Sequence, residues 1–327
     1  MVDEIFLALS LKISRSEKVF LFEVLAERFD QYPRKSRILE TGFRWRRNMR
    51  RRSAIYVPGS NMRAMHKAAS LGADAIIYDL EDSVAPQMKS QARENVAVAV
   101  DADHPRNHER VVRINGISTE EYEADLTAAI AAKPDAILVP KVSRPDELLS
   151  AQRAIDAGSS PISLWAMIET PLAIGNLFAI AESVTKATPA LSCLVLGTND
   201  LVKDMRMPPP VDRQYIRPAL LSCVAAARAY GLTVLDGVFN GLDAGEQYEM
   251  ECREGRALGM DGKTLIHPGQ IDLCNQIFSQ SDRDRDWARR VINAFEAPEN
   301  ASKGAIRVDG EMLERLHLAV ARRILSS

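Results

Sequence analysis

The sequence has no closely spaced cysteine pair, no large excess of charge and no long apolar run. Its four cysteines lie far apart without a C-x-x-C pair, so the spacing of a zinc site or a disulfide framework is missing. A formal net charge of -2 gives no field that would attract nucleic acid. Every apolar run falls short of the roughly 18 residues that cross a bilayer. These absences predict a cytoplasmic protein that binds a small molecule, with neither nucleic acid nor a membrane as its partner.

The first 50 residues differ in composition from the rest. The start is acidic and lacks the basic region and the small-residue cleavage site of a secretory signal. Between Arg28 and Arg52 the chain turns basic, with the runs RKSR and RWRRNMRRR. A block of like charges is more often a solvated extension than a phosphate-binding arm. We therefore expect residues 1–50 to form a basic extension outside the folded unit.

From residue 53 onward, short apolar runs alternate with segments whose apolar residues lie three and four positions apart, as in amphipathic helices. The runs are continuously apolar, which predicts strands buried on both faces of a parallel sheet. Eight such units in succession favour an α/β fold of the (β/α)8 TIM barrel type over an open sheet. The runs are SAIYVPG, AIIYDLEDS, RVVRING, AILVPKV, SLWAMIET, LSCLVLGTND, TVLDGVF and KTLIHP.

Other features of the chain narrow the architecture further. None of the runs is followed by a G-x-G-x-x-G turn, so a dinucleotide-binding half is not indicated. After the eighth unit, RDRDWARRVINAFEAPEN and GEMLERLHLAVARRIL predict two more helices. We expect a barrel over residues 51–280 and a C-terminal helical appendage over residues 281–327.

Polar residues gather at the carboxyl ends of the predicted strands. In a parallel barrel these ends open onto one face, where the catalytic residues of TIM barrels lie. Polar residues at all eight junctions favour an active site there over structural polar caps. In strand order they are Pro58-Gly59-Ser60, Glu81-Asp82, Arg113 with Asn115, Lys141, Glu169-Thr170, Asn199-Asp200, Asp236 and His267.

Several of these side chains are carboxylates. Asp79, Glu81 and Asp82 follow a buried run, where such groups are costly unless they are solvated, paired or bound to a metal. Glu169 and Asp200 add further hard oxygen ligands, with Glu81 or Asp82 as additional candidates. Mg²⁺ suits this set, because it is held by one or two carboxylates while substrate and water complete its octahedron.

Two basic side chains accompany the carboxylates. Arg113 is a permanent cation that could stabilise an anion in a transition state. It could equally pair with Glu81 or Asp82, and the two roles can coexist. For Lys141 an ion pair at the rim is favoured over a Schiff base, because a metal would already serve as the electron sink.

The turn Pro58-Gly59, with Arg63 in the first turn of the following helix, has the composition of a phosphate site. Backbone N–H groups at a helix start, together with an arginine, can bind phosphate. Pro-Gly turns are common in proteins. A plain turn therefore stays an equal alternative.

Motifs from nearly every predicted strand occur together in one order. They are RSAIYVPGSN, DAIIYDLEDSVAPQMKSQAR, VVRING, AILVPKV, WAMIETPLAI, LVLGTNDL and GRALGMDGKTLIHPGQI. From residue 51 to the C-terminus the chain thereby resembles the citrate lyase β-subunit family, which includes malyl-CoA and citramalyl-CoA lyases. Agreement across so many motifs is far more specific than any one of them.

The resemblance implies a Mg²⁺-dependent (β/α)8 barrel that makes or breaks a C–C bond between an acetyl thioester and a 2-oxo acid. It implies that Glu169 and Asp200 bind the metal and that Arg113 stabilises the thioester enolate. The remaining residues that it implicates are Glu81 and Asp82 beside the metal and its waters, and Pro58, Gly59 and Arg63 near the phosphates of coenzyme A.

The C-terminal segment departs from the family pattern. In the CoA-dependent lyases that the chain resembles, a G-x-M-I-D segment reaches a neighbouring subunit and supplies an aspartate for proton transfer. This chain reads DGEMLERLH, which places Glu314 at that position. The resemblance therefore implies a homo-oligomer, a trimer or hexamer, with Glu314 as the proton-transfer residue. Glutamate can do this chemistry, but it is one methylene longer.

Two other activities stay open at this point. One is a metal-dependent aldolase acting on free 4-hydroxy-2-oxo acids, and the other is a citrate lyase β subunit acting on a citryl acyl-carrier protein. We favour cleavage of a 3-hydroxyacyl-CoA of the malyl, citramalyl or citryl type, because the phosphate-binding turn and the C-terminal segment are both present. The sequence does not choose among these acyl groups, since one methylene in a pocket is worth only roughly 1–3 kcal/mol.

Overall fold

The protein is described by a computed structural model that covers residues 50–326, apart from residues 103–107, 159–160, 184–190, 210–212 and 301. The basic extension expected over residues 1–50 therefore lies outside the described residues, except for Arg50. Within the described part, the chain forms a barrel followed by a C-terminal helix–hairpin–helix segment.

Eight parallel strands close into a barrel in the order of the sequence, and β1 pairs with β8 through Ser53 and Lys263. Each strand coincides with one of the eight apolar runs, so the (β/α)8 barrel prediction is confirmed. The strands are β1 (Ser53–Pro58), β2 (Ala75–Asp79), β3 (Glu109–Arg113), β4 (Ala136–Val139), β5 (Ser163–Ile168), β6 (Leu191–Leu196), β7 (Thr233–Asp236) and β8 (Gly262–Leu265).

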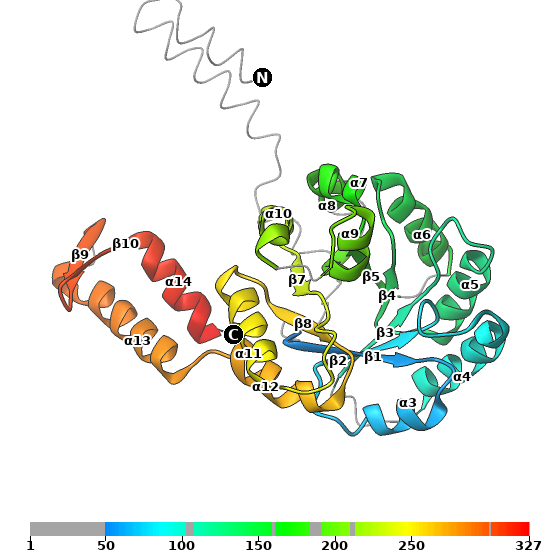
Figure 1. Ribbon diagram of the computed structural model, residues 1–327. Helices are drawn as coiled ribbons and strands as arrows, with labels where there is room; N and C mark the ends of the chain where they lie inside the picture. The colour runs from blue at the N-terminus through cyan, green and yellow to red at the C-terminus, as the bar shows by residue number, and fades with distance from the viewer. Residues whose placement is uncertain are drawn as a thin grey trace, which may run out of the picture. The chain divides into compact units, whose positions relative to one another are not determined.

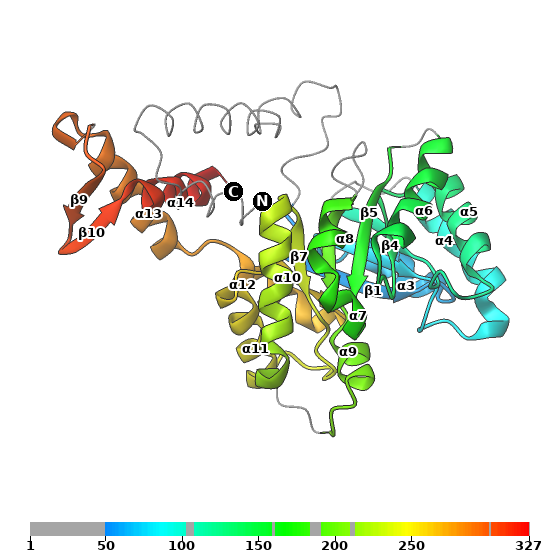
Figure 2. The same cartoon turned by 90° about the horizontal axis from the view of Figure 1, so that it is seen from above.

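Helices surround these strands (Figure 1), and the view in Figure 2 shows α10 beside α8. None of the helices in the described part of the chain is long and apolar enough to span a membrane. The helices of the barrel are α3 (Met62–Ala68), α4 (Lys89–Asp101), α5 (Tyr122–Ala132), α6 (Pro145–Ala157), α7 (Pro171–Gly175), α8 (Leu177–Ser183), α9 (Thr198–Asp204), α10 (Arg217–Tyr230), α11 (Glu246–Ala257) and α12 (Ile271–Phe278).

The strands bury both of their faces, which explains why their sequences are continuously apolar. Alternate residues point into the barrel, where Trp165, Leu138 and Ile77 are fully buried in an inner core. The other residues face the helices and form a larger outer core, which includes Ile76 and Ile137. The two cores hold the strand ends, and the polar side chains that follow them, in a fixed arrangement.

The amino ends of the strands are joined by one arginine. Arg51, just before β1, makes two hydrogen bonds to Glu109 at the start of β3, with Nε–Oε2 and Nη2–Oε1 distances of 2.7 and 2.8 Å. Its Nη1 also donates to the carbonyl of Ser192 at 3.1 Å, and its guanidinium lies 4.8 Å from the ring centre of Trp165. Arg51 therefore links β1, β3, β5 and β6 at the end of the barrel opposite to the predicted site.

The C-terminal segment differs in part from the prediction of two helices. Helices α13 (Asp282–Glu296) and α14 (Arg315–Ser326) enclose a hairpin of β9 (Ala305–Val308) and β10 (Glu311–Glu314). The hairpin turn is Asp309-Gly310, with φ values of 51° and 89°, as an Asp-Gly type I′ turn requires. The helix expected over GEMLERLHLAVARRIL thus begins only at Arg315. The domain boundary placed at residues 280 and 281 stays a prediction.

We predict that Arg51→Ala lowers the free energy of unfolding by about 3 kcal/mol. The substitution leaves Glu109, whose side chain is only 5% exposed, without its partner, and removing one member of a buried pair costs roughly 3–5 kcal/mol. Urea unfolding followed by circular dichroism measures the change. Arg289→Ala, which removes an exposed ion pair with Asp286, is the control and should change the stability by less than about 1 kcal/mol. Equal changes in the free energy of unfolding for the two substitutions would contradict the stabilising role assigned to the buried pair of Arg51 and Glu109.

Candidate functional site

The carboxyl ends of β2 and β3 are joined by a buried ion pair. Asp79 and Arg113 are the last residues of these strands and lie opposite each other in the sheet register. Nε and Nη2 of Arg113 donate to the two oxygens of Asp79 at 2.6 and 2.7 Å. Although burial opposes ionisation, Arg113 and the hydrogen bonds hold the pKa of Asp79 below its usual value. This pair fixes the guanidinium at the mouth of the barrel. Its Cζ atom lies over the ring of Tyr56, 4.8 Å from the ring centre.

Glu81 lies between two cations. Its Oε2 is 2.9 Å from Nη1 of Arg113, and its Oε1 accepts a 2.5 Å hydrogen bond from Nζ of Lys141. Asp82 is the outermost of the three carboxylates, with its side chain 58% exposed, 3.9 Å from Arg113 and 3.7 Å from Lys141. Burial raises the pKa of Glu81, and Arg113 and Lys141 act in the opposite direction. Two basic side chains of the protein itself therefore offset the negative charges of Glu81 and Asp82.

A buried lysine, Lys89, binds the loop that carries Glu81 through hydrogen bonds. Nζ of Lys89 donates to the carbonyls of Leu80 and Glu81, both at 2.7 Å, and to Oδ1 of Asn115 at 2.9 Å. The backbone N–H of Glu81 donates to Asp79 at 2.9 Å. The sequence pattern does not indicate the role of Lys89. The pairing of Asp79 with Arg113 has a signal in the sequence, because both residues stand where an apolar run becomes polar, in two neighbouring predicted strands.

Glu169, at the end of β5, is buried with one oxygen bound and the other free. Its Oε1 accepts a 2.7 Å hydrogen bond from the backbone N–H of Lys141. Its Oε2 is buried and has no hydrogen-bond partner among the described residues. Burial, together with the nearby charge of Glu81, raises the pKa of Glu169 to about 8. A side chain at Gly197 would collide with this carboxylate, so the glycine keeps its space open.

Asp200 supplies the second predicted metal ligand from the first turn of α9. Its charge contributes to the raised pKa of Glu169, and its Oδ1 contacts Nζ of Lys203. An unpartnered buried oxygen beside a second carboxylate fits Mg²⁺, which needs only one or two carboxylates when substrate and water complete its shell. No cluster of three or more potential ligands (His, Cys, Asp or Glu) occurs in the part of the chain that the structure describes. The donor set thus fits a metal that is shared with substrate rather than one enclosed by protein.

The Pro58-Gly59 turn is a close approach of two backbone segments. The N–H of Gly59 donates to the carbonyl of Asp79 at 2.8 Å, and a Cβ at Gly59 would lie 2.8 Å from that carbonyl and 2.9 Å from Val96. The glycine is therefore required by packing. Arg63 is exposed on α3, and its contact with coenzyme A phosphates stays a prediction.

Three other predicted residues lie apart from this cluster. Asp236, at the end of β7, is fully buried and pairs with Lys263 at 3.0 Å and Arg213 at 2.8 Å, so it serves an internal ion network. His267 caps the turn that follows β8 by accepting a hydrogen bond from Gly269. Glu314 is exposed on β10, and its proton-transfer role stays a prediction.

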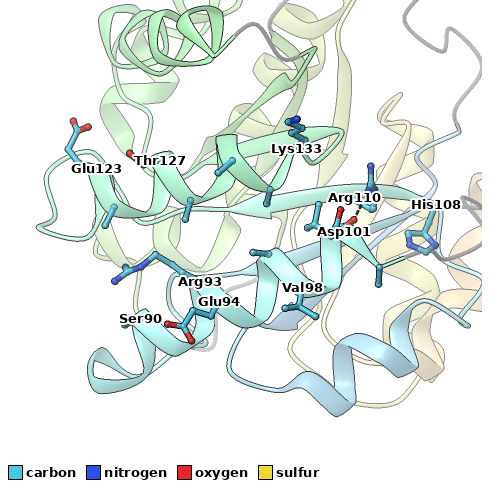
Figure 3. Close-up of a pocket in the computed structure, with 17 residues that line it drawn as sticks. Ser90, Arg93, Glu94, Val98, Asp101, His108, Arg110, Glu123, Thr127 and Lys133 are labelled. Carbon is cyan, nitrogen blue, oxygen red and sulfur yellow. Dashed lines mark hydrogen bonds between the residues drawn. The ribbon is translucent and has the colours of Figure 1, made fainter.

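Two cavities bear on where a ligand could bind. One of about 510 Å³ lies beside the ends of β6 and β7 and is lined by Thr198 and Asn199, the neighbours of Asp200. Another of about 1390 Å³ lies between α4 and α5 (Figure 3), where Arg93 and Glu123 are among its lining residues. The second cavity includes none of the predicted site residues. The smaller cavity is lined by residues next to Asp200 in the sequence, but none of the carboxylates of the cluster is among its lining residues.

Known proteins resemble this chain in sequence over most of its length. The HpcH/HpaI aldolase/citrate lyase family matches residues 52–268. A (3S)-malyl-CoA thioesterase of Cereibacter sphaeroides is 44% identical over 275 residues, which cover 84% of this chain and 93% of the relative. The citrate lyase subunit beta of Escherichia coli is 31% identical over 296 residues, which cover 88% of this chain and 97% of the relative.

Solved structures show the same barrel. The protein CitE of Mycobacterium tuberculosis, in complex with magnesium, acetoacetate and coenzyme A, has a TM-score of 0.69 and 26% identity, covering 84% of this chain and 96% of that one. A citrate lyase of Burkholderia xenovorans has a TM-score of 0.74 at 22% identity, covering 84% of this chain and 90% of that one. The second similarity concerns the fold alone.

We predict that binding of Mg²⁺ strengthens as the pH rises from 6 to 8. The metal-free carboxyl of Glu169 has a pKa of about 8, so below that pH the proton competes with the metal, and affinity gains about tenfold per pH unit. Isothermal titration calorimetry in buffers of different ionisation enthalpy measures both the affinity and the released proton. In Glu169→Gln this proton release should vanish. A pH-independent affinity in the unsubstituted protein would contradict the prediction.

Proposed function

The chain belongs to the HpcH/HpaI aldolase/citrate lyase family, and on this basis we propose that it is a Mg²⁺-dependent carbon–carbon lyase. Its substrate would be a 3-hydroxyacyl-CoA thioester with a carboxylate on the hydroxyl-bearing carbon, of the malyl, citramalyl or citryl type. The products would be acetyl-CoA and a 2-oxo acid, and the reaction would be reversible. The observation that carries this proposal is the free, buried Oε2 of Glu169 beside the cluster of Arg113, Glu81 and Lys141.

Glu169 and Asp200 are the residues that would hold Mg²⁺. Bound there, the ion supplies a Lewis acid for the oxygens of the substrate. Glu169 presents a single oxygen, because Lys141 occupies the other. Arg113 and Lys141 lie at the same end of the barrel but already pair with carboxylates, so the bound cation would supply the charge that attracts an anionic substrate.

In this proposal Arg113 stabilises the negative charge that develops when the C–C bond breaks. When a base takes the proton of the substrate hydroxyl, the oxygen forms the carbonyl of the 2-oxo acid, the C–C bond breaks and its electron pair moves to the acetyl thioester, which becomes an enolate. A guanidinium that is already fixed by Asp79 can hold this charge without reorganising during the reaction. The charge of Arg113 persists because Asp79 raises the pKa of its guanidinium against the effect of burial.

The enolate must then take a proton on carbon. Glu314 of a neighbouring subunit is our candidate for this step, which makes the homo-oligomer part of the proposal. The exposed Arg63 and the turn at Gly59 are our candidates for the contact with coenzyme A phosphates. The support for a CoA substrate comes from the relative that is a malyl-CoA thioesterase and from the CitE complex that contains coenzyme A.

A second activity, hydrolysis of the thioester, is favoured by one observation. The relative with 44% identity is a (3S)-malyl-CoA thioesterase. Hydrolysis would release the free hydroxy acid and coenzyme A, whereas C–C cleavage would release acetyl-CoA and the 2-oxo acid. The two reactions differ in whether the C–C bond or the thioester bond breaks, so the products identify the reaction.

We predict that the protein with Mg²⁺ converts at least one of malyl-CoA, citramalyl-CoA and citryl-CoA to acetyl-CoA and the matching 2-oxo acid. Liquid chromatography of the thioesters and a dehydrogenase assay of the acid measure the products. Glu169→Gln should lower the rate by about 10³-fold, since a metal-bound oxygen is worth several kcal/mol in a transition state. Glu94→Gln, an exposed change on α4, is the control, and EDTA should abolish the reaction.

Other reaction products would change the activity that we propose for this protein. Free coenzyme A and the hydroxy acid as first products, with no acetyl-CoA at early times, would replace the lyase with a hydrolase. A folded protein that binds Mg²⁺ and cleaves none of the three thioesters would contradict the proposal. It would favour the aldolase on free acids or the subunit that acts on an acyl-carrier protein.

We predict that Glu314→Gln lowers turnover by roughly 10²–10⁴-fold, the usual contribution of a positioned acid or base, while leaving the affinity for Mg²⁺ unchanged. Glu311→Gln, at the other end of the same strand, is the control. Co-expression of Glu314→Gln with Glu169→Gln should restore part of the activity if Glu314 acts in a neighbouring subunit. Full activity of Glu314→Gln alone would remove it from the mechanism.

A further inference from the structure

Lys141 has a backbone conformation that is unusual for its place in the fold. Its φ of 53° lies in the left-handed region, which side chains rarely adopt. The other non-glycine residues with positive φ in the described part of the chain are Lys133 and Arg206, which follow helices, and Asp309 in the hairpin turn. Left-handed residues are ordinary at such places. Lys141 instead follows a barrel strand, β4.

This conformation allows one residue to hold two carboxylates from other strands. The backbone N–H of Lys141 donates to Oε1 of Glu169, after β5, at 2.7 Å. Its ammonium donates to Oε1 of Glu81, after β2, at 2.5 Å. Lys141 thus lies between the candidate metal ligand and the acidic loop that carries Glu81.

Hydrogen bonds hold the loop after β4 in place and keep Lys141 in its left-handed conformation. Oγ of Ser143 lies 2.7 Å from Oγ1 of Thr170, and Nδ2 of Asn176 donates to the carbonyl of Ser143 at 2.9 Å. The N–H of Ser143 donates to Glu147 at 2.6 Å, and Val142 is buried. A left-handed residue survives in a fold when its surroundings determine it in this way, and such residues gather at functional sites.

The hydrogen bond from Lys141 decides which oxygen of Glu169 is available. Oε1 is occupied by the N–H, and Oε2 is buried without a partner among the described residues. The carboxylate cannot turn without breaking that bond. Partners of metal ligands commonly set the orientation and the affinity of the ligand in this manner.

We propose that Lys141 is a positioning residue of the site: its backbone N–H orients Glu169 so that only Oε2 faces the divalent cation, and its ammonium holds Glu81 against Arg113. The inference rests on the proposed function, because it concerns the same metal-binding carboxylate. The two parts of the residue have separate effects, since the N–H governs metal affinity and the ammonium governs turnover.

Three substitutions in the full-length protein separate the two parts. Lys141→Gly adopts positive φ without strain and keeps the N–H, so Mg²⁺ affinity should stay as in the unsubstituted protein while kcat falls about 10- to 100-fold. Lys141→Val disfavours positive φ, so Mg²⁺ affinity should also fall by about tenfold or more. Lys141→Arg, which keeps a cation, should recover most of the turnover lost in the glycine variant.

Lys133 offers a matched control, because it is also a lysine with a φ of 57° but lies at the end of α5. Lys133→Gly and Lys133→Val repeat the same backbone changes away from the site. They should leave Mg²⁺ affinity and kcat unchanged, although the valine variant should melt at a lower temperature. Titration calorimetry with MgCl₂, steady-state kinetics and thermal unfolding are measured on all variants.

The outcomes separate this inference from the proposed function. If the unsubstituted protein binds Mg²⁺ and Glu169→Gln does not, but Lys141→Val binds it with unchanged affinity, the inference is overturned and the metal site stands. Unchanged kcat in Lys141→Gly overturns the part assigned to the ammonium. If Glu169→Gln binds Mg²⁺ as well as the unsubstituted protein, both the metal site and the inference are overturned.

Discussion

The buried ion pair between Asp79 and Arg113 is the interaction on which the rest of the site depends. It forms because the last residues of two neighbouring strands lie opposite each other in a parallel register. Once Arg113 is fixed by two short hydrogen bonds, its remaining N–H groups can face Glu81 and the mouth of the barrel. A buried arginine with one carboxylate has nearly neutral surroundings. Glu81 adds a negative charge, which is why a second cation, Lys141, is needed beside it.

Glu169 is a buried carboxylate whose charge and hydrogen bonding the described residues satisfy only in part. Burial and the neighbouring acidic side chains raise its pKa, and one of its oxygens has no partner in the described structure. A divalent cation would satisfy that oxygen and offset the charges of Glu169 and Asp200 together. The raised pKa comes first from burial and then from the charges of the neighbouring carboxylates, and the unpartnered oxygen is open to a cation. Carboxylates perturbed in this way cluster at functional sites.

Much of the fold was accessible from the sequence, because burial of both strand faces leaves a pattern that is local to each strand. The eight apolar runs coincide with the eight strands, and the matching family and relatives confirm the expected resemblance. The failures have equally specific causes. The stretch GEMLERLHLAVARRIL has apolar residues three and four positions apart, as a helix does, but the Asp309-Gly310 turn makes its first part, Glu311–Glu314, a strand. Asp236 ends a strand as the candidate residues do, but its partner Lys263 comes from β8 and neutralises it.

Three features can be read directly from the sequence: the barrel, the face on which the polar side chains gather, and the kinds of chemical group available there. These follow from the period of burial and from the rule that parallel strands present their carboxyl ends together. The pairing of each carboxylate with its cation, and the choice of the oxygen of Glu169 that stays without a partner, follow from the folded structure alone. Those outcomes depend on distances of a few ångströms between residues on different strands, and on the left-handed backbone of Lys141. Neither is encoded in a local pattern, because each results from the register and packing of the closed barrel.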